Sequence, residues 1–384
     1  MATKSPSARQ PKKGLSYSEW RTYRFRMRRV ARDMTSRRAV MKCGTSHYDR
    51  FASAPDFRSV KILEMNGRAR IDGTIHCKNP WECPTCAEVQ SRSASELLRQ
   101  AVNQNRRAGG GSLTVTLTLP HEAGDALRPM QRHVAQAWGF VQSGAPWKRH
   151  TARLGIVGVV RTLEVTHGPN GWHPHLHVLI FTANPLDASQ LAQCQDFLYQ
   201  RWARAIGKPN KLTGVRYGEP SRARGVVVRA TRRADYLGKW GATEEMLAKQ
   251  YKAGRAGHRN PWQILRDVVE RGGARDRWLW REYCTAMKGA KQLTFSRGFK
   301  TRFALAVQRA GTDQLELGGL LVAEIEGNTW NQVFNDRPRL CGRLLELAES
   351  GLSPPHLADW IEEMVTKITD QSSALWSQPL PAVA

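Results

Sequence analysis

Residues 154–181 read LGIVGVVRTLEVTHGPNGWHPHLHVLIF, and they carry the strongest structural signal in the chain. Two segments rich in β-forming residues, 154–166 and 172–181, lie on either side of the turn-forming sequence at 167–171. Strand-forming runs separated by such a short turn are typical of a β-hairpin. We therefore predict two antiparallel strands joined by a tight turn.

Histidines recur at every second position of the second strand, at His173, His175 and His177. Because successive side chains of a strand point to opposite faces, all three share one face. Imidazoles that converge on one side of a rigid strand favour a divalent-metal site. Glu164, on the first strand, lies between apolar neighbours and could face the histidines across the pair. A further metal ligand and an ordinary solvent-facing glutamate are both open interpretations of Glu164.

The flanking sequence places this hairpin in an α+β protein. Residues 112–119 alternate with period two and predict the clearest strand of the chain. Other β-like stretches are 60–75, with a turn at Asn66-Gly67, and parts of 212–229. Helical patterns cover residues 18–30, 87–107, 126–142, 187–206 and 231–240, and most of the chain beyond 245. Strands joined by a hairpin as well as by helices favour a central, mainly antiparallel sheet flanked by helices.

A tyrosine and a lysine lie one helical turn apart beyond the histidines, at Tyr236 and Lys239. A tyrosine hydroxyl can attack a phosphodiester and keep the 5′ phosphate as a covalent intermediate. A nearby lysine can offset the charge that develops on the phosphate, and a metal can polarise the phosphate. By itself such a pair more often reflects a packed tyrosine. Its value comes from following the histidine strand in chain order.

With these features in place, the sequence resembles the rolling-circle replication initiators (Rep proteins) of small plasmids, which are HUH endonucleases. Three motifs carry the resemblance in the family's order: Leu113-Thr-Val-Thr-Leu-Thr-Leu119, His175-Leu176-His177 and Tyr236-Leu-Gly-Lys239. The resemblance extends through residues 260–266 and 291–298 and covers roughly residues 40–305.

The resemblance implies a palm-like antiparallel sheet that carries the histidines centrally, with the tyrosine helix beside it. It implies metal-dependent nicking of a plasmid double-strand origin, with Mg²⁺ or Mn²⁺, covalent attachment of Tyr236 to the 5′ end, and later strand transfer. His175 and His177 match the family's metal-binding pair. His173 is left as a third ligand, as a competitor of Glu164 for that place, or as a contact to the scissile phosphate.

The residues around the tyrosine depart from the family pattern in one respect. Some members place a glutamate four residues before the tyrosine, where it activates water at termination. Here that position is Arg232, and the nearest acid is Asp235. The spacing does not choose between Asp235 and a second tyrosine for this step. The candidate tyrosines are Tyr199, Tyr217 and Tyr251.

Four of the seven cysteines lie between residues 41 and 90. A Cys-x-x-Cys pair before a predicted helix is a common half of a structural zinc site. We predict Zn²⁺ bound by Cys43, Cys77, Cys83 and Cys86, with His76 or His47 in reserve for Cys43. A redox pair is disfavoured because no thioredoxin-like βαβ pattern surrounds it. The other three, Cys194, Cys284 and Cys341, are isolated, and we predict ordinary core positions for them.

The charge balance indicates the class of partner. Lysine and arginine total 59 against 33 aspartates and glutamates, a net charge of +26 over 384 residues. Such an excess fits a nucleic-acid partner, so the basic segment at 18–30 either faces DNA or is a solvated charged face. No run of about 18 apolar residues is present, and the first residues lack the apolar core of a secretory signal. We therefore predict a cytoplasmic DNA-binding protein without membrane association.

Four segments are expected along the chain. Residues 1–40 form a basic, partly disordered arm, 41–107 the zinc-binding segment and its helix, 108–305 the HUH endonuclease domain, and 306–384 a region of unknown role. No Gly-x-x-x-x-Gly-Lys-Ser/Thr motif is present, so host helicase and polymerase are expected partners. The alternatives are a transposase or relaxase of the same superfamily, or a non-catalytic, zinc-containing DNA-binding regulator.

Overall fold

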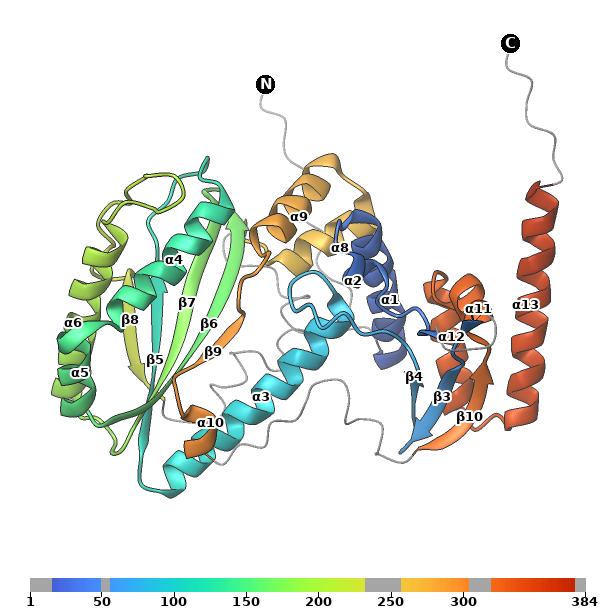
Figure 1. Cartoon of the computed structure of the whole chain (residues 1–384), viewed down its shortest axis with the longest axis horizontal. Coiled ribbons are helices and arrows are strands. Elements are labelled where there is room, and N and C mark those ends of the chain that lie inside the picture. The colour runs from blue at the N-terminus through green and yellow to red at the C-terminus, as the bar shows by residue number, and fades with distance from the viewer. Residues whose placement is uncertain (1–15, 50–55, 232–256, 304–318, 377–384) are drawn as a thin grey trace, which may run out of the picture. The chain divides into compact units, whose positions relative to one another are not determined.

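The computed structural model describes residues 16–49, 56–231, 257–303 and 319–376 (Figure 1). The chain divides into two compact units. Unit 1 comprises residues 1–79, 83–86 and 311–384, and unit 2 comprises residues 80–82 and 87–310. Both units combine an antiparallel sheet with helices, which confirms the predicted α+β class.

Unit 2 is built on a five-stranded sheet in the order β8-β5-β7-β6-β9, in which all neighbours are antiparallel. Its strands are β5 (Gly111–Thr118), β6 (Ile156–Gly168), β7 (Gly171–Thr182), β8 (Val226–Ala230) and β9 (Leu293–Phe295). The predicted hairpin is confirmed as β6 and β7, which pair along their whole length. Gly171, at the turn, has a φ of 78° that favours glycine. The histidine strand is therefore central in the sheet, flanked by β5 and β6.

Helices cover both faces of this sheet. They are α3 (Pro84–Arg107), α4 (Leu127–Val141), α5 (Gly144–Arg153), α6 (Ala188–Ile206), α8 (Pro261–Arg271), α9 (Ala274–Ala286) and α10 (Phe299–Arg302). Leu98 of α3 and Phe299 of α10 bury the face that carries Phe181 of β7. Leu176 and Val178 lie on the opposite face and are also fully buried. The sheet is thus closed on both sides at one end, while the end bearing the histidines keeps half-buried side chains.

Unit 1 joins segments from both ends of the sequence. Its helices are α1 (Tyr17–Met34), α2 (Arg38–Met41), α11 (Gly327–Thr329), the π-helix η4 (Trp330–Phe334), α12 (Pro338–Glu349) and α13 (Pro354–Trp376). Its strands are β1 (Tyr48–Asp49), β2 (Asp56–Phe57), β3 (Val60–Met65), β4 (Arg68–Asp72) and β10 (Leu320–Ile325). Antiparallel β10, β3 and β4 form one sheet. The predicted turn at Asn66-Gly67 is confirmed by positive φ angles of 54° and 74°.

The elements missed from the sequence are short or depend on distant partners. α5 was not predicted, and β9 and β10 interrupt a region predicted to be mostly helical. Around Val215–Tyr217 the predicted β-like stretch forms no strand. The predicted helix at 231–240 lies almost entirely outside the described residues. The packing of residues 319–376 with residues 16–79 also differs from the predicted division, which separates 41–107 from 306–384.

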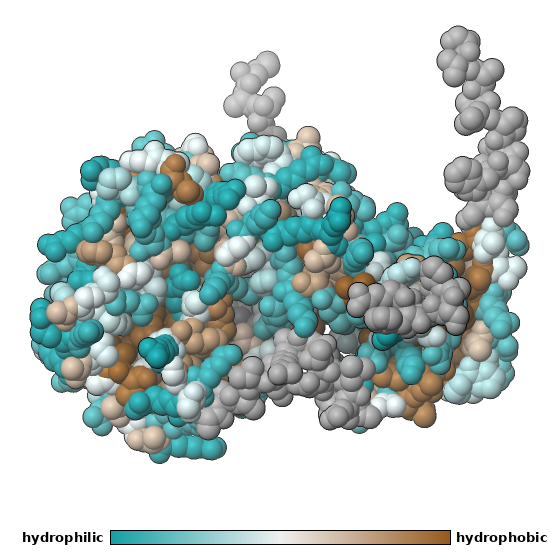
Figure 2. Space-filling view, in the orientation of Figure 1, coloured by the Kyte–Doolittle hydropathy of each residue, from teal (hydrophilic) through white to brown (hydrophobic). Residues whose placement is uncertain are grey.

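One face of the described chain can be seen in a space-filling view. Hydrophilic side chains cover most of the face shown in Figure 2, in keeping with the large excess of lysine and arginine. Among the helices that the structure describes, none has the length and apolar character needed to cross a membrane.

Candidate functional site

Glu164 of β6 and His175 and His177 of β7 form one group on the same face of the unit 2 sheet. The pairing register places Glu164 directly opposite His175. Oε2 of Glu164 lies 2.7 Å from Nε2 of His177 and 3.2 Å from Nε2 of His175. All three side chains are half-buried, so the group is fixed by the strands and still reachable from solvent. The hairpin register thus brings Glu164 to the histidines.

The other ring nitrogens of this pair of histidines have partners of their own. Nδ1 of His177 lies 3.3 Å from Oγ1 of Thr116, which is its neighbour on β5. Nδ1 of His175 lies 3.3 Å from the carbonyl oxygen of His173. Contacts of this kind orient an imidazole and fix which nitrogen is offered to a ligand. Here they leave both Nε2 atoms directed at Glu164.

His173 shares the strand face but takes a different partner. Its Nδ1 lies 2.7 Å from Nε2 of His121, which follows β5 after Pro120. Burial, followed by the nearby charges of His175 and His121, lowers the pKa of His173 to about 4. The lowered pKa favours the neutral form of His173, whose ring lies against His121. The three histidines therefore separate into a pair that meets Glu164 and a third that meets another histidine.

The chemistry of the Glu164, His175 and His177 group suits a divalent cation. Two imidazole nitrogens and a carboxylate oxygen lie within 4.8 Å of one another. Imidazole and carboxylate together accept several divalent metals of the first transition row, and the carboxylate also suits Mg²⁺. A bound cation would replace the hydrogen bonds that the two rings now make to one carboxylate. The donor set therefore fits the predicted catalytic metal.

Four thiols meet in unit 1. Sγ of Cys43 lies 3.5 Å from Sγ of Cys83 and 3.6 Å from Sγ of Cys86, and Cys77 lies 3.6 Å from Cys86. These separations are too long for a disulfide. They resemble the spacing of about 3.8 Å expected when thiolates bind tetrahedral zinc at about 2.3 Å. The four predicted cysteines therefore form a cluster that could hold zinc.

Hydrogen bonding in this cluster favours thiolate formation at two sulfurs. The pKa of Cys43 is lowered to about 7 by its hydrogen bonds with Cys77 and Cys83. The pKa of Cys86 lies below its ordinary value, because Cys43, Cys77 and Cys83 all hydrogen-bond to its sulfur. The pKa of His76 is raised by its hydrogen bond to Cys86, so His76 lies beside the cluster. The remaining cysteines, Cys194, Cys284 and Cys341, are buried, as predicted.

Residues 68–205 match the family described as replication protein. "Protein rep" of Streptomyces lividans is 23% identical over 322 residues, which span 68% of this chain and 70% of that protein. The predicted resemblance to Rep replication proteins is confirmed. No solved structure matches the chain.

The Rep-like segment contains the candidate metal group. It runs from β4 to α6 and so includes β5, the histidine hairpin and Glu164. Tyr236 and Lys239 lie beyond the segment and also outside the described residues. The proposed nucleophile therefore still rests on the sequence motif.

The described candidates for the termination step are packed in the interior. The hydroxyl of Tyr199 donates to Oε1 of Glu219 and to the carbonyl oxygen of Pro220, at 2.9 and 2.8 Å. Tyr217 is buried against the ring of His133. These contacts are those of structural tyrosines. Arg232, Asp235 and Tyr251, the other residues considered for this step, lie outside the described residues.

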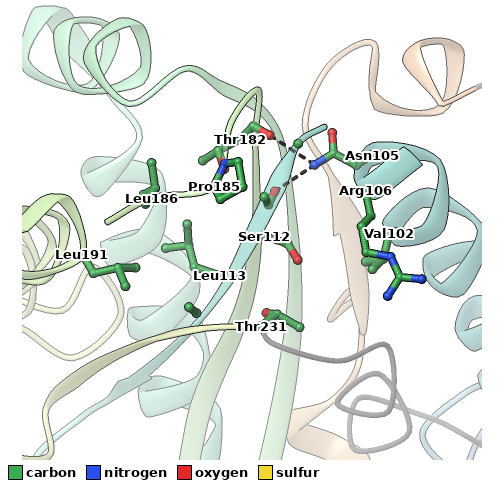
Figure 3. Close-up of a pocket in the computed structure, with 13 residues that line it drawn as sticks. Val102, Asn105, Arg106, Ser112, Leu113, Thr182, Pro185, Leu186, Leu191 and Thr231 are labelled. Atoms are coloured by element: carbon green, nitrogen blue, oxygen red, sulfur yellow. Dashed lines mark hydrogen bonds between the residues drawn. The ribbon is translucent and has the colours of Figure 1, made fainter. Parts of the chain in front are cut away.

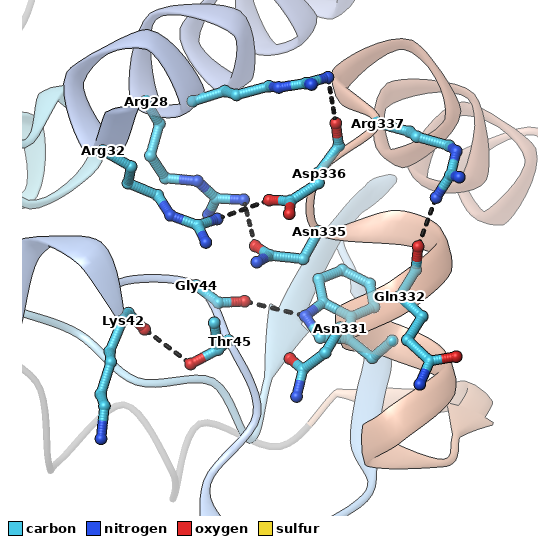
Figure 4. A network of polar contacts seen from close by, with 12 residues as sticks. Arg28, Arg32, Lys42, Gly44, Thr45, Asn331, Gln332, Asn335, Asp336 and Arg337 are labelled. Carbon is cyan, nitrogen blue, oxygen red and sulfur yellow. Dashed lines mark hydrogen bonds and ion pairs between the residues drawn. The ribbon is translucent and has the colours of Figure 1, made fainter. Parts of the chain in front are cut away.

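The basic segment at 18–30 forms α1, and much of its positive charge meets the C-terminal part of unit 1 (Figure 4). Nη2 of Arg28 donates to Oδ1 of Asn335 at 3.0 Å, and Nη1 of Arg32 lies 2.9 Å from Oδ1 of Asp336. Neither a fully solvated face nor a DNA-facing one describes these arginines. α1 is instead held against the segment that precedes α12.

A cavity of about 280 Å³ lies at the far end of β5 and β7, away from the histidines (Figure 3). Nδ2 of Asn105 bridges the carbonyl oxygens of Gly111 and Thr182 at 2.8 and 3.2 Å. Leu113 and Leu186 also line the cavity. Thr231, on its rim, immediately precedes the segment that carries Tyr236.

Sequence reasoning missed two groups that shape the metal group. The contact of Thr116 could have been predicted in part, because its strand was predicted. Once the β5–β7 register is known, the alternation of side chains along β5 places Thr116 on the histidine face. His121 follows the strand after a proline, where no periodic pattern applies. Only the packed structure brings His121 to His173.

Proposed function

We propose that this protein is a rolling-circle replication initiator that nicks origin DNA through a covalent tyrosine intermediate. The observation that carries the proposal is the placement of Glu164 against His175 and His177 inside the segment that matches replication proteins. The sheet that carries them supports a palm of the HUH type. The net charge of +26 supports a DNA partner.

In the proposed reaction, the hydroxyl oxygen of Tyr236 attacks the scissile phosphorus. A P–O bond to tyrosine forms, the bond to the 3′ oxygen breaks, and that oxygen leaves as a free 3′ hydroxyl after taking up a proton. Lys239 offsets negative charge on the phosphate. Glu164, His175 and His177 would hold Mg²⁺ or Mn²⁺, which when bound polarises the scissile phosphate. Attack of a 3′ hydroxyl on the phosphotyrosine later transfers the strand and frees the tyrosine.

The decisive experiment traps the covalent intermediate. Purified full-length protein is incubated with Mn²⁺ and a pool of random single strands labelled at the 3′ end, because the 3′ fragment carries the 5′ phosphate that joins tyrosine. We expect a labelled protein band that survives denaturation, absent in Tyr236→Phe and present in Tyr251→Phe. The proposal would be contradicted if Tyr236→Phe forms as much adduct as the wild type. It would also be contradicted if the wild type forms no adduct with either single-stranded or supercoiled DNA.

We also propose that the Cys43, Cys77, Cys83 and Cys86 cluster binds one structural Zn²⁺. Val40 packs against these cysteines, and together they form a small buried cluster of unit 1. Elemental analysis should give one zinc per wild-type chain and less than half of that in Cys83→Ser, whereas Cys341→Ser should keep its zinc. Equal zinc contents in wild type and Cys83→Ser would refute the assignment.

A further inference from the structure

A second cavity of unit 2 opens beside the candidate metal group. It measures about 140 Å³, and Glu164 and His177 form part of its wall. Segments distant in the sequence enclose it: the stretch before α3 and α3 itself, the outer edge of β6, the start of β9, and helices α8 and α9. Pockets for drug-sized ligands typically measure about 300–1,000 Å³. This cavity therefore suits a single flat ring system.

Three aromatic side chains give the cavity apolar walls. Trp81 is 6% exposed, and its Nε1 donates to the carbonyl oxygen of Ala290 at 3.0 Å. Its ring meets that of Tyr283 edge to face, with centroids 6.3 Å apart. Trp262 of α8 is half-buried and is backed by Trp280, with centroids 5.8 Å apart. Rigid aromatic walls of this kind favour a planar ligand that stacks.

Polar groups line the same cavity. The polar residues Asn260 and Gln292 are part of its wall. On the outer edge of β6, the N–H of Leu163 donates to the backbone carbonyl oxygen of Gln292 at 3.0 Å. The backbone N–H and C=O groups of His167 pair with those of Arg259 at 2.8 and 2.7 Å. Alternate residues of an antiparallel strand turn their backbone groups to the same edge. Val165, between these two, therefore directs its N–H and C=O toward the cavity that it lines.

A ligand that satisfies both kinds of wall is flat, aromatic, and carries hydrogen-bond donors and acceptors around its rim. A nucleobase has this chemistry. We propose that the cavity binds one unstacked nucleobase of single-stranded DNA, from the nucleotide that adjoins the phosphate to be cut. The inference rests on the proposed function, which supplies single-stranded DNA as the ligand. A base bound in this cavity places its own sugar–phosphate backbone next to Glu164 and His177. Trp262 supplies the stacking surface, and Gln292 contacts the base edge.

The test measures binding without cleavage. Full-length protein is titrated, without added divalent cation, into fluorescently labelled 15-mers of dT, dA and dC and an abasic 15-mer. Stacking on one aromatic ring is worth about ten- to hundredfold in affinity. We expect Trp262→Ala to lose that factor toward the preferred strand and to bind it about as weakly as the abasic strand. Trp262→Phe should retain most of the affinity, and Gln292→Ala should change the ranking of the three bases.

Trp147→Ala is the matched control, because Trp147 is also a half-buried tryptophan but lies on α5 against Trp138 and Phe197. It should bind like the wild type. Equal affinity of Trp262→Ala and wild type for the preferred strand, or equal affinity of the wild type for abasic and base-bearing strands, would overturn the inference. If the wild type forms the Tyr236 adduct while either of these two results is obtained, only the inference about the cavity is refuted. If Trp262→Ala loses binding but the wild type forms no adduct, only the nicking reaction is refuted.

Discussion

At the scale of single residues, the carboxylate of Glu164 is the group on which the metal site depends. Its Oε2 meets both Nε2 atoms of the histidine pair, and its charge offsets that of a dication. Glu164→Gln keeps the size and removes the charge. We expect the Mn²⁺ concentration for half-maximal adduct formation to rise at least about tenfold, and the rise in Tm that Mn²⁺ gives the wild type to disappear.

The control for this variant is Glu122→Gln, since Glu122 is an exposed carboxylate on the loop after β5. It should keep the Mn²⁺ response of the wild type. The same Mn²⁺-dependent rise in Tm in Glu164→Gln and wild type would show that the cation binds elsewhere.

A buried histidine makes unit 2 sensitive to acid. His150 is 2% exposed and stacks on Phe197 with centroids 3.8 Å apart. Burial, then the charge of Arg153, lowers the pKa of His150 to about 4. The unfolded chain, with a pKa of about 6.5, binds the proton first, so this contribution to stability is complete above pH 6.5 and is lost as the pH falls toward 4.

His150→Phe keeps the stacked ring and removes the titration. Between pH 7 and pH 5 the wild type should lose about 2 kcal/mol more of its unfolding free energy than the variant. Urea unfolding at both pH values measures this difference. A loss that is identical in both proteins would exclude His150 as a source of the acid sensitivity.

At the scale of elements, we propose that helix α9 of the described unit 2 contacts DNA. Arg275 and Arg281 are exposed, and Trp278 between them is 61% exposed. Basic side chains contact phosphates, and an exposed aromatic ring can stack on a base. Replacing both arginines by alanine should weaken DNA binding and reduce the slope of log affinity against log salt by about 2.

A charge-matched control separates this effect from the loss of net charge. Lys148 and Arg149 are exposed on α5, which lies at the other end of unit 2 (Figure 1). Their double alanine variant loses the same charge and should change the salt slope by less than half as much. Equal slopes for the two double variants would mean that DNA contacts no particular part of this unit.

The same scale shows what could be predicted from the sequence and what could not. The hairpin of β6 and β7 was predictable because its turn and its alternation are local, and alternation alone placed the histidines on one face. The contact of Glu164 needed the exact register of that hairpin, which the turn sequence leaves open. β9 and β10 were missed because three- and six-residue strands form on distant partners. The cavity beside Glu164 and His177 combines residues of α3, β6, β7, α8, α9 and β9, so no local pattern could reveal it.

At the scale of the whole molecule, unit 1 depends on both ends of the chain. β10 pairs with β3, and α12 packs on α1. In the described part of the chain, the carboxylate of Glu349 on α12 contacts two other elements of unit 1. Its Oε1 accepts hydrogen bonds from Nη1 of Arg21 at 2.5 Å and from the backbone N–H of Ala69 at 2.9 Å. One carboxylate therefore joins helix α1, the β3–β4 hairpin and helix α12.

This arrangement predicts a large effect of one substitution far from the proposed active site. Arg21 is 2% exposed, so Glu349→Gln leaves a buried guanidinium without its counter-charge. Removing one partner of a buried pair costs about 3–5 kcal/mol, and unit 1 should unfold at a clearly lower temperature in calorimetry. Glu363→Gln, which breaks the exposed pair with Lys367, should cost less than about 1 kcal/mol. Because Glu349 lies in unit 1 and the metal group in unit 2, Glu349→Gln should still form the Tyr236 adduct below that transition. Equal thermal shifts in the two variants would show that the C-terminal segment does not stabilise unit 1 through this contact.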